Sequence, residues 1–149
     1  MYFDDCVVGA EHAAASHVVT AREIIEFART WDPQPWHVDE EVARASIFGG
    51  LTACSAHIFS IFCITSQRWQ SGVVQQAVAG LGFDEMRMHK PVYADDTLHC
   101  TSTVGAVRAS KSKPDCGIVT FHTQLLNQHA EVVFSIKASS LMARDPARQ

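Results

Sequence analysis

The sequence predicts an α+β protein in which an antiparallel sheet is wrapped around one long central helix. No charged residue occurs between Arg44 and Arg68, and the apolar residues there recur at helical spacing. Three runs rich in Val, Ile, Thr and Phe follow, separated by short polar turns, over 98–109, 117–127 and 131–142. Such runs are typical of an antiparallel meander, and a sheet must bury one face against another layer.

Length and composition are those of an ordinary globular domain. The chain has 149 residues, 47% hydrophobic and 19% charged, so we expect one domain over 1–149. A domain of this length needs no disulfide or bound metal to fold. A net charge of −4 disfavours nucleic acid as a partner. The five cysteines include no Cys-x-x-Cys pair, which favours a reduced, cytoplasmic compartment over a disulfide framework. We expect no metal.

The uncharged stretch between Arg44 and Arg68 is long enough in principle to cross a bilayer. It also contains Ser, Thr, Gln and His side chains and a pair of glycines, so a buried helix is the better interpretation. The acidic N-terminus carries no signal pattern. We therefore expect no membrane partner.

The first elements are short. Residues 17–19 suggest a brief strand. Thr20 and Glu23 form a capping box, in which the hydroxyl and the carboxylate satisfy free amides at a helix start. The apolar residues that follow have helical spacing, which predicts an amphipathic helix over 21–30.

Residues 31–39 then interrupt the helical pattern. Pro33 and Pro35 lack the amide donor that a helix interior needs, and each pushes its predecessor toward extended backbone. Asp32 and His37 are therefore expected on a stiff, non-helical loop between two helices. Taken singly, each has a plain structural interpretation, as a turn residue and a core histidine. Together, a carboxylate and an imidazole five residues apart can converge on one water.

The longest predicted helix follows a glycine turn. Asp39 can cap a short helix over 40–45. After two adjacent glycines, residues 51–69 are predicted to form a helix roughly 28 Å long at 1.5 Å per residue. His57 within it is expected to be buried and hydrogen-bonded.

A further strand is predicted over 78–90, ended by Pro91. A single sheet wrapped around one helix leaves a sheet edge open, which is an aggregation hazard. Pairing of sheet edges between two copies removes this hazard, so we expect a homodimer or a higher homo-oligomer.

Two segments together resemble a known family. They are Asp-Pro-Gln-Pro-Trp-His over 32–37 and Phe-Gly-Gly-Leu-Thr-Ala over 48–53. They resemble the MaoC-like dehydratases, also called hydratase-2 or (R)-specific enoyl-CoA hydratases, whose core motif is Asp-x-Asn-Pro-x-His. Two later segments, 87–98 and 108–114, also fit the family pattern.

The resemblance implies a hot-dog fold, an antiparallel sheet wrapped around one helix and usually paired as a dimer. It also implies reversible hydration of a trans-2-enoyl thioester to a (3R)-hydroxyacyl thioester, with coenzyme A as part of the substrate and no other cofactor. In that chemistry Asp32 and His37 hold the water and move its proton, and which of them does which stays open. The backbone amide of Ser55, at the helix start, holds the thioester oxygen.

The chain departs from the family pattern at two positions. Gln34 stands for the motif asparagine, and Ser55 stands where the family has glycine, so a side chain narrows the site. These departures keep a non-catalytic acyl-thioester-binding subunit open as an alternative. A hot-dog acyl-CoA thioesterase is a second alternative, which the presence of Asp32 and His37 disfavours.

The resemblance also suggests residues that bind the rest of the substrate. Trp36 is expected to line the acyl pocket or simply to pack, and Gly50 to lie beside the substrate. Arg108, Lys111 and Lys113 form a basic run that can meet the phosphates of coenzyme A. The plainer interpretation of this run is a solvated hairpin turn.

Overall fold

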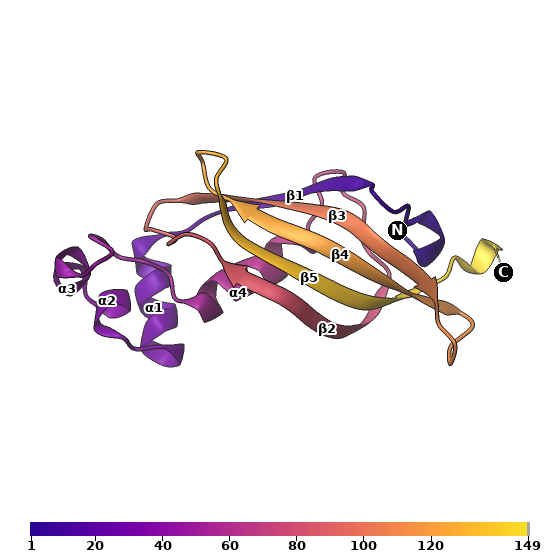
Figure 1. Ribbon diagram of the computed structural model, residues 1–149, viewed down its shortest axis with the longest axis horizontal. Helices are drawn as coiled ribbons and strands as arrows, with labels where there is room; N and C mark the ends of the chain where they lie inside the picture. Colours follow the sequence, from indigo (N-terminus) through magenta and orange to yellow (C-terminus); the bar gives the residue numbers. More distant parts are fainter. Residues whose placement is uncertain (149) are drawn as a thin grey trace.

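The centre of the fold is a five-stranded antiparallel sheet with the strand order β1-β3-β4-β5-β2. The computed structural model describes residues 1–148. Helix α4 (Ser55–Thr65) lies against one face of this sheet, which confirms the predicted hot-dog architecture (Figure 1). The strands are β1 (Glu11–Val18), β2 (Ala77–Met88), β3 (Thr97–Ala109), β4 (Cys116–Leu126) and β5 (Val132–Ala143).

Three short helices gather at one end of the sheet, away from both chain termini (Figure 1). They are α1 (Ala21–Trp31), α2 (Pro35–Val38) and α3 (Glu40–Ala45). The Asp39 carboxylate accepts hydrogen bonds from the first amides of α3, as predicted. Two single-turn 3₁₀ helices, Phe3–Asp5 and Pro146–Arg148, lie at the other end.

Only half of the predicted capping box at the start of α1 is present. The Thr20 hydroxyl accepts the Glu23 amide at 3.2 Å, as expected. The Glu23 carboxylate does not turn back to the Thr20 amide, because it contacts His17 and His57 instead. A tertiary contact therefore replaces the local one.

The central helix is shorter than predicted. It has 11 residues, roughly 16 Å, and begins at Ser55 rather than at residue 51. Residues 51–53 are extended because they pair with residues 92–94. The Ala53 amide donates to the Val92 carbonyl at 2.8 Å, and the Ala94 amide donates to the Leu51 carbonyl at 3.1 Å. Backbone groups used in this pairing cannot also form a helix.

The predicted helix also ends early. After Thr65 the chain turns toward β1, where the Gln70 amide donates to the Ala13 carbonyl at 3.0 Å. Trp69 is buried by stacking on His12, with ring centroids 3.9 Å apart. The helical pattern therefore predicted the burial of Trp69 correctly, although Trp69 lies outside the helix.

Strand β1 was largely missed by the sequence, which predicted only 17–19. It pairs with β3 from Glu11 to Val18 and carries an irregularity between Ala13 and Ser16. An alanine-rich strand has weak strand propensity, and the irregularity removes the regular alternation. The later strands lie within about two residues of their predicted ranges.

The core lies between α4 and the sheet. Ile58, Ile61 and Phe62 of α4 are buried against it. Inward-facing sheet residues with no exposed surface complete it, including Leu98 and Val104 of β3, Val119 and Leu125 of β4, and Phe134 and Met142 of β5. This packing fixes the position of α4, and with it the position of the helix start.

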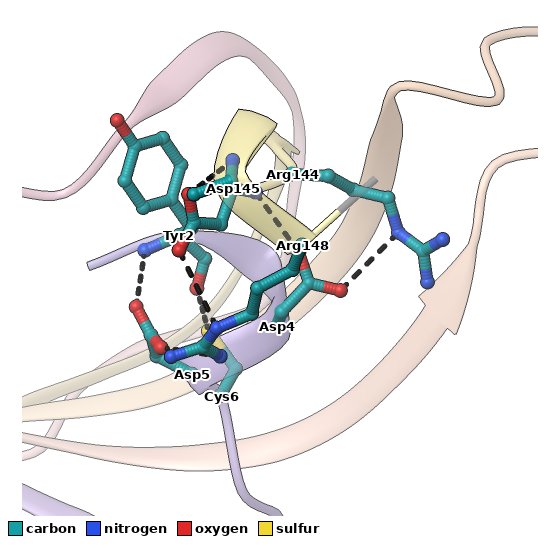
Figure 2. Close-up of polar contacts among 8 residues, drawn as sticks. Tyr2, Asp4, Asp5, Cys6, Arg144, Asp145 and Arg148 are labelled. Atoms are coloured by element: carbon teal, nitrogen blue, oxygen red, sulfur yellow. Dashed lines mark hydrogen bonds and ion pairs between the residues drawn. The ribbon is translucent and has the colours of Figure 1, made fainter.

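The two chain ends are tied together, as Figure 2 shows. Arg144 pairs with Asp4 at 3.4 Å and Arg148 pairs with Asp5 at 3.0 Å. Phe3 lies beneath the Arg144 guanidinium, 5.3 Å from it, and over Gly117, where a Cβ atom would meet the ring. The N-terminal turn is therefore held on the end of the sheet that is remote from α1–α3.

Within residues 1–148, no helix combines the length and the apolar character needed to cross a bilayer.

Candidate active site

Two prolines determine where α1 ends and where α2 begins. Asp32 is the C-cap of α1, and its amide donates to the Ala28 carbonyl at 2.9 Å. Pro33 cannot continue the helix, whereas Pro35 suits the first position of a new one. The prediction that His37 lies on a non-helical loop is wrong, because His37 is the third residue of α2.

The tautomer of His37 is set by a backbone carbonyl. Its ring is buried, and Nδ1 lies 2.7 Å from the carbonyl oxygen of Thr52. A carbonyl oxygen can only accept, so Nδ1 carries the proton and Nε2 of the neutral ring is an acceptor. The partner is itself held in place, because Thr52 forms a bridge with Tyr93.

One cavity of about 320 Å³ brings together three predicted site residues. Asp32 comes from the end of α1, His37 from α2 and Ser55 from the first position of α4. Its remaining walls come from the 48–54 segment, α4 and the end of β2, and they are Phe48, Thr52, Ala53, Cys54, Ile58, Met88, His89, Lys90 and Pro91.

The start of α4 supplies positive potential to this cavity. The first amides of a helix have no acceptor within the helix, and the helix dipole favours negative charge at that end. Cys54 precedes them and is buried. Burial raises the pKa of the Cys54 thiol, and the Asp32 carboxylate adds to this against the lowering effect of the His57 amide. The thiol therefore stays protonated, as a packing residue.

Two predicted substrate contacts are not among the residues that line this cavity. Trp36 packs edge-on against His37, with ring centroids 6.0 Å apart, which fits its packing interpretation. Gly50 lies beside the ring of Tyr93, whose hydroxyl donates to the Phe48 carbonyl at 2.8 Å. Gly50 thus belongs to the segment behind the cavity wall.

The basic run lies elsewhere in the chain. Arg108 is near the end of β3, and Lys111 and Lys113 lie in the turn that leads to β4. This turn is at the opposite end of the sheet from α1–α3 (Figure 1). Within one chain these side chains do not reach the cavity. Contact with coenzyme A at this cavity would need a second copy of the chain, and it stays a prediction.

Among the cavity residues that the sequence interpretation did not predict as site residues, two are basic, His89 and Lys90. The Lys90 ammonium forms an ion pair with Glu131, and its hydrogen bond lowers the pKa of that exposed carboxyl. His89 Nε2 lies 2.7 Å from the Ser135 hydroxyl. The available signal was Pro91 directly after them, which predicts that the strand ends here, since the loops that follow strands often carry site residues.

Within residues 1–148, no cluster of three His, Cys, Asp or Glu side chains is arranged to hold a metal ion.

Comparisons with known proteins agree with this fold. The family model for the FAS1-like dehydratase domain region matches residues 6–136. The structure of a MaoC-like dehydratase from Rhodospirillum rubrum is 39% identical, with a TM-score of 0.88 over 98% of this chain and 99% of that one. The fold and these matches together define a hot-dog protein of the dehydratase class. The chain belongs to the MaoC-like dehydratase family.

Two curated proteins are also similar. The uncharacterized protein YdeM of Bacillus subtilis is 30% identical over 145 residues, which cover 97% of this chain and all of that protein. A mesaconyl-CoA hydratase from Cereibacter sphaeroides is 35% identical over 96 residues, or 64% of this chain. That match spans only 27% of the hydratase.

Proposed function

We propose that the protein catalyses the reversible hydration of a trans-2-enoyl thioester to a (3R)-hydroxyacyl thioester, with the acyl group carried on coenzyme A. One observation supports this most strongly. An imidazole with a fixed acceptor nitrogen, a carboxylate and the first amide of a helix share one cavity. Hydration requires a base, an acid and a donor for the thioester oxygen. In the proposed reaction the imidazole acts first as the base and then as the acid, the carboxylate helps to hold the water, and the amide is the donor.

The two acceptors suit a water molecule. Asp32, when ionised, and Nε2 of neutral His37 each accept one hydrogen bond. A water that donates to both has its oxygen lone pairs free to point at the β-carbon of a bound enoyl group. Positioning of this kind removes much of the entropic barrier to the addition.

His37 is the base in the proposed step. Nε2 takes a proton from the water as the oxygen bonds to the β-carbon, and the alkene electron pair moves to the thioester oxygen. The Ser55 amide and the dipole of α4 stabilise that negative oxygen, an effect worth roughly 3 kcal/mol for each donor. Asp32 and the Thr52 carbonyl stabilise the imidazolium that forms.

The proton then returns to the substrate. The imidazolium gives it to the α-carbon, the enolate collapses to the thioester, and His37 is neutral again. One O–H bond has broken, and one C–O and one C–H bond have formed. Because a single side chain takes and returns the proton from one side of the substrate, the addition is syn. Lys90 lines the cavity, and its ammonium could attract the anionic part of the thioester carrier on leaving its ion pair with Glu131.

The direct test incubates the purified protein with crotonyl-CoA and follows enoyl absorbance and free thiol together. We expect the enoyl absorbance to fall without release of thiol. His37→Ala should lower kcat by about 10²–10⁴-fold, the usual contribution of general acid–base catalysis. Asp32→Asn should lower kcat by about 100-fold, because the water is no longer held in position and the imidazolium loses its carboxylate. His129→Ala, in the exposed β4–β5 turn, is the control and should keep wild-type rates.

Other outcomes contradict the proposal. Thiol release would indicate a thioesterase. No change with enoyl-CoA substrates of short and long chain would indicate a non-catalytic binding subunit. A wild-type rate in either the Asp32→Asn or the His37→Ala variant would exclude that residue from the proposed step.

A further inference from the structure

A buried histidine that the proposed reaction does not use joins α1 to α4. His57 is the third residue of α4 and is only 6% exposed. Its Nε2 lies 3.3 Å from Oε1 of Glu23, in the first turn of α1. Its ring stacks on Phe27, one turn further along α1, with centroids 4.6 Å apart and planes 10° from parallel.

The acceptor in this contact is firmly held. The same oxygen of Glu23 lies 2.7 Å from Nε2 of His17, at the end of β1. The Thr20 hydroxyl accepts the Glu23 amide and lies 3.4 Å from its second carboxylate oxygen. One carboxylate therefore joins β1, α1 and α4.

The chemistry of the contact is directional. A carboxylate only accepts, so Nε2 is the nitrogen of His57 that carries the proton in this 3.3 Å contact. Nδ1 is then a buried acceptor, and within residues 1–148 it has no hydrogen-bond partner. An unpaired buried polar atom is unfavourable, so a purely packing role would be served better by an apolar side chain. The polar contact with Glu23 is therefore what a histidine provides at this position and an apolar side chain would not.

The same two helices carry residues that line the proposed reaction cavity. Asp32 caps the far end of α1, five residues beyond Phe27, and Ser55 begins α4, two residues before His57. Any rotation or slide of α1 on α4 changes where the Asp32 carboxylate lies relative to the Ser55 amide. A displacement of about 1 Å at a reacting centre is enough to cost roughly 100-fold in rate.

We infer that His57 is a positioning residue. Through its polar contact with Glu23 and its stacking on Phe27, it fixes α1 against α4 and so sets the separation of Asp32 from the Ser55 amide. The expected effect on catalysis rests on the proposed hydratase function. The expected effect on local structure does not.

The kinetic test separates the two contacts of His57. His57→Phe keeps an aromatic ring for Phe27 but loses the donor, whereas His57→Gln keeps a donor for Glu23. We expect His57→Phe and Glu23→Ala each to lower kcat about 100-fold with KM changed less than about twofold, and His57→Gln to recover most of kcat. The double variant His57→Phe/Glu23→Ala should be no slower than the slower single variant, because the two substitutions remove the same contact.

The matched control lies on the same helix. Glu26 of α1 is exposed and pairs with Arg22, so Glu26→Ala removes a carboxylate without touching the α1–α4 contact. It should leave kcat unchanged. A loss of kcat in the His57→Phe variant that is fully explained by a lower folded fraction, seen in thermal unfolding, would overturn the inference.

A second measurement needs no activity. Hydrogen exchange should be faster at amides 31–38 and 55–58 in His57→Phe and Glu23→Ala than in the wild type and Glu26→Ala. Unchanged exchange in His57→Phe overturns the positioning role. A wild-type protein without hydratase activity overturns the proposed function instead. The exchange result then decides by itself whether His57 fixes α1 against α4.

Discussion

At the scale of single residues, the partner atom decides what each buried imidazole can do. His37 has its Nδ1 against a backbone carbonyl, which leaves Nε2 as an acceptor in the cavity. His57 has its Nε2 against the Glu23 carboxylate, which leaves Nδ1 unpaired in the interior. The first arrangement suits the base of the proposed reaction, and the second suits the positioning role proposed for His57. Two histidines that are alike in sequence thus acquire different roles.

The environment of His57 also predicts a pH effect on stability. Burial lowers its pKa and nearby His17 lowers it further, against the opposing effect of Glu23; these are the charged groups that α1 and β1 bring to it. Because the folded pKa lies below the usual 6.5, the unfolded state binds more protons as pH falls below that value. Stability is therefore lost from about pH 6.5 downward until the folded pKa is passed.

The check is urea unfolding at about pH 7 and about pH 5 for the wild type and for His57→Gln. The wild type should lose more unfolding free energy on acidification than the variant, which lacks this imidazole. Equal losses in the two proteins would show that His57 does not titrate differently in the folded state.

At the scale of elements, the short helices that carry the site depend on their caps. Helix α3 has six residues and is too short to be stable alone. Asp39 accepts the amides of Glu41 and Val42 at 2.9 and 3.0 Å, and its own amide closes α2 by donating to the Pro35 carbonyl. One residue therefore ends the helix of His37 and begins the next.

Asp39→Ala should lower the free energy of unfolding by about 1 kcal/mol, the usual effect of removing an N-cap side chain. Asp39→Asn keeps an acceptor oxygen and should lose much less. Chemical denaturation of both variants gives the comparison. If alanine and asparagine behave alike, the side-chain cap contributes nothing to stability.

At the scale of the whole molecule, β2 is an edge strand with an apolar surface. Four of its side chains, Val78, Leu81, Phe83 and Met86, are each 44–54% exposed. One side of the strand pairs with β5, and its other side is open. An open apolar edge of this kind is a site for pairing with another chain.

We therefore expect a homodimer in solution, formed through β2. Leu81→Lys should shift the protein toward monomer in sedimentation velocity at micromolar concentration, since a buried lysine would oppose the contact. Val18→Lys provides the control on the other sheet edge, because Val18 is an exposed residue of β1. A wild-type monomer, or dissociation by Val18→Lys alone, would contradict dimerisation through β2.

Local signals in the sequence were enough for much of the fold and for placing Asp32 and His37 near one another; their catalytic roles stay a prediction. Thr20 and Pro33 bound α1, Asp39 begins α3, and the alternating runs give β3–β5. These features depend on capping, on the missing proline amide and on strand periodicity, all of which act within a few residues. The spacing of Asp32 and His37 on a proline-rich segment likewise pointed to one site.

The tertiary structure decided what depends on residues distant in sequence. The start of α4 is set by the pairing of residues 51–53 with 92–94, and its end by the turn toward β1. The tautomer of His37 depends on Thr52, and the membership of Lys90 in the cavity depends on where β2 ends. Buried extended and buried helical residues have the same apolar composition, so only the contacts across the fold distinguish them.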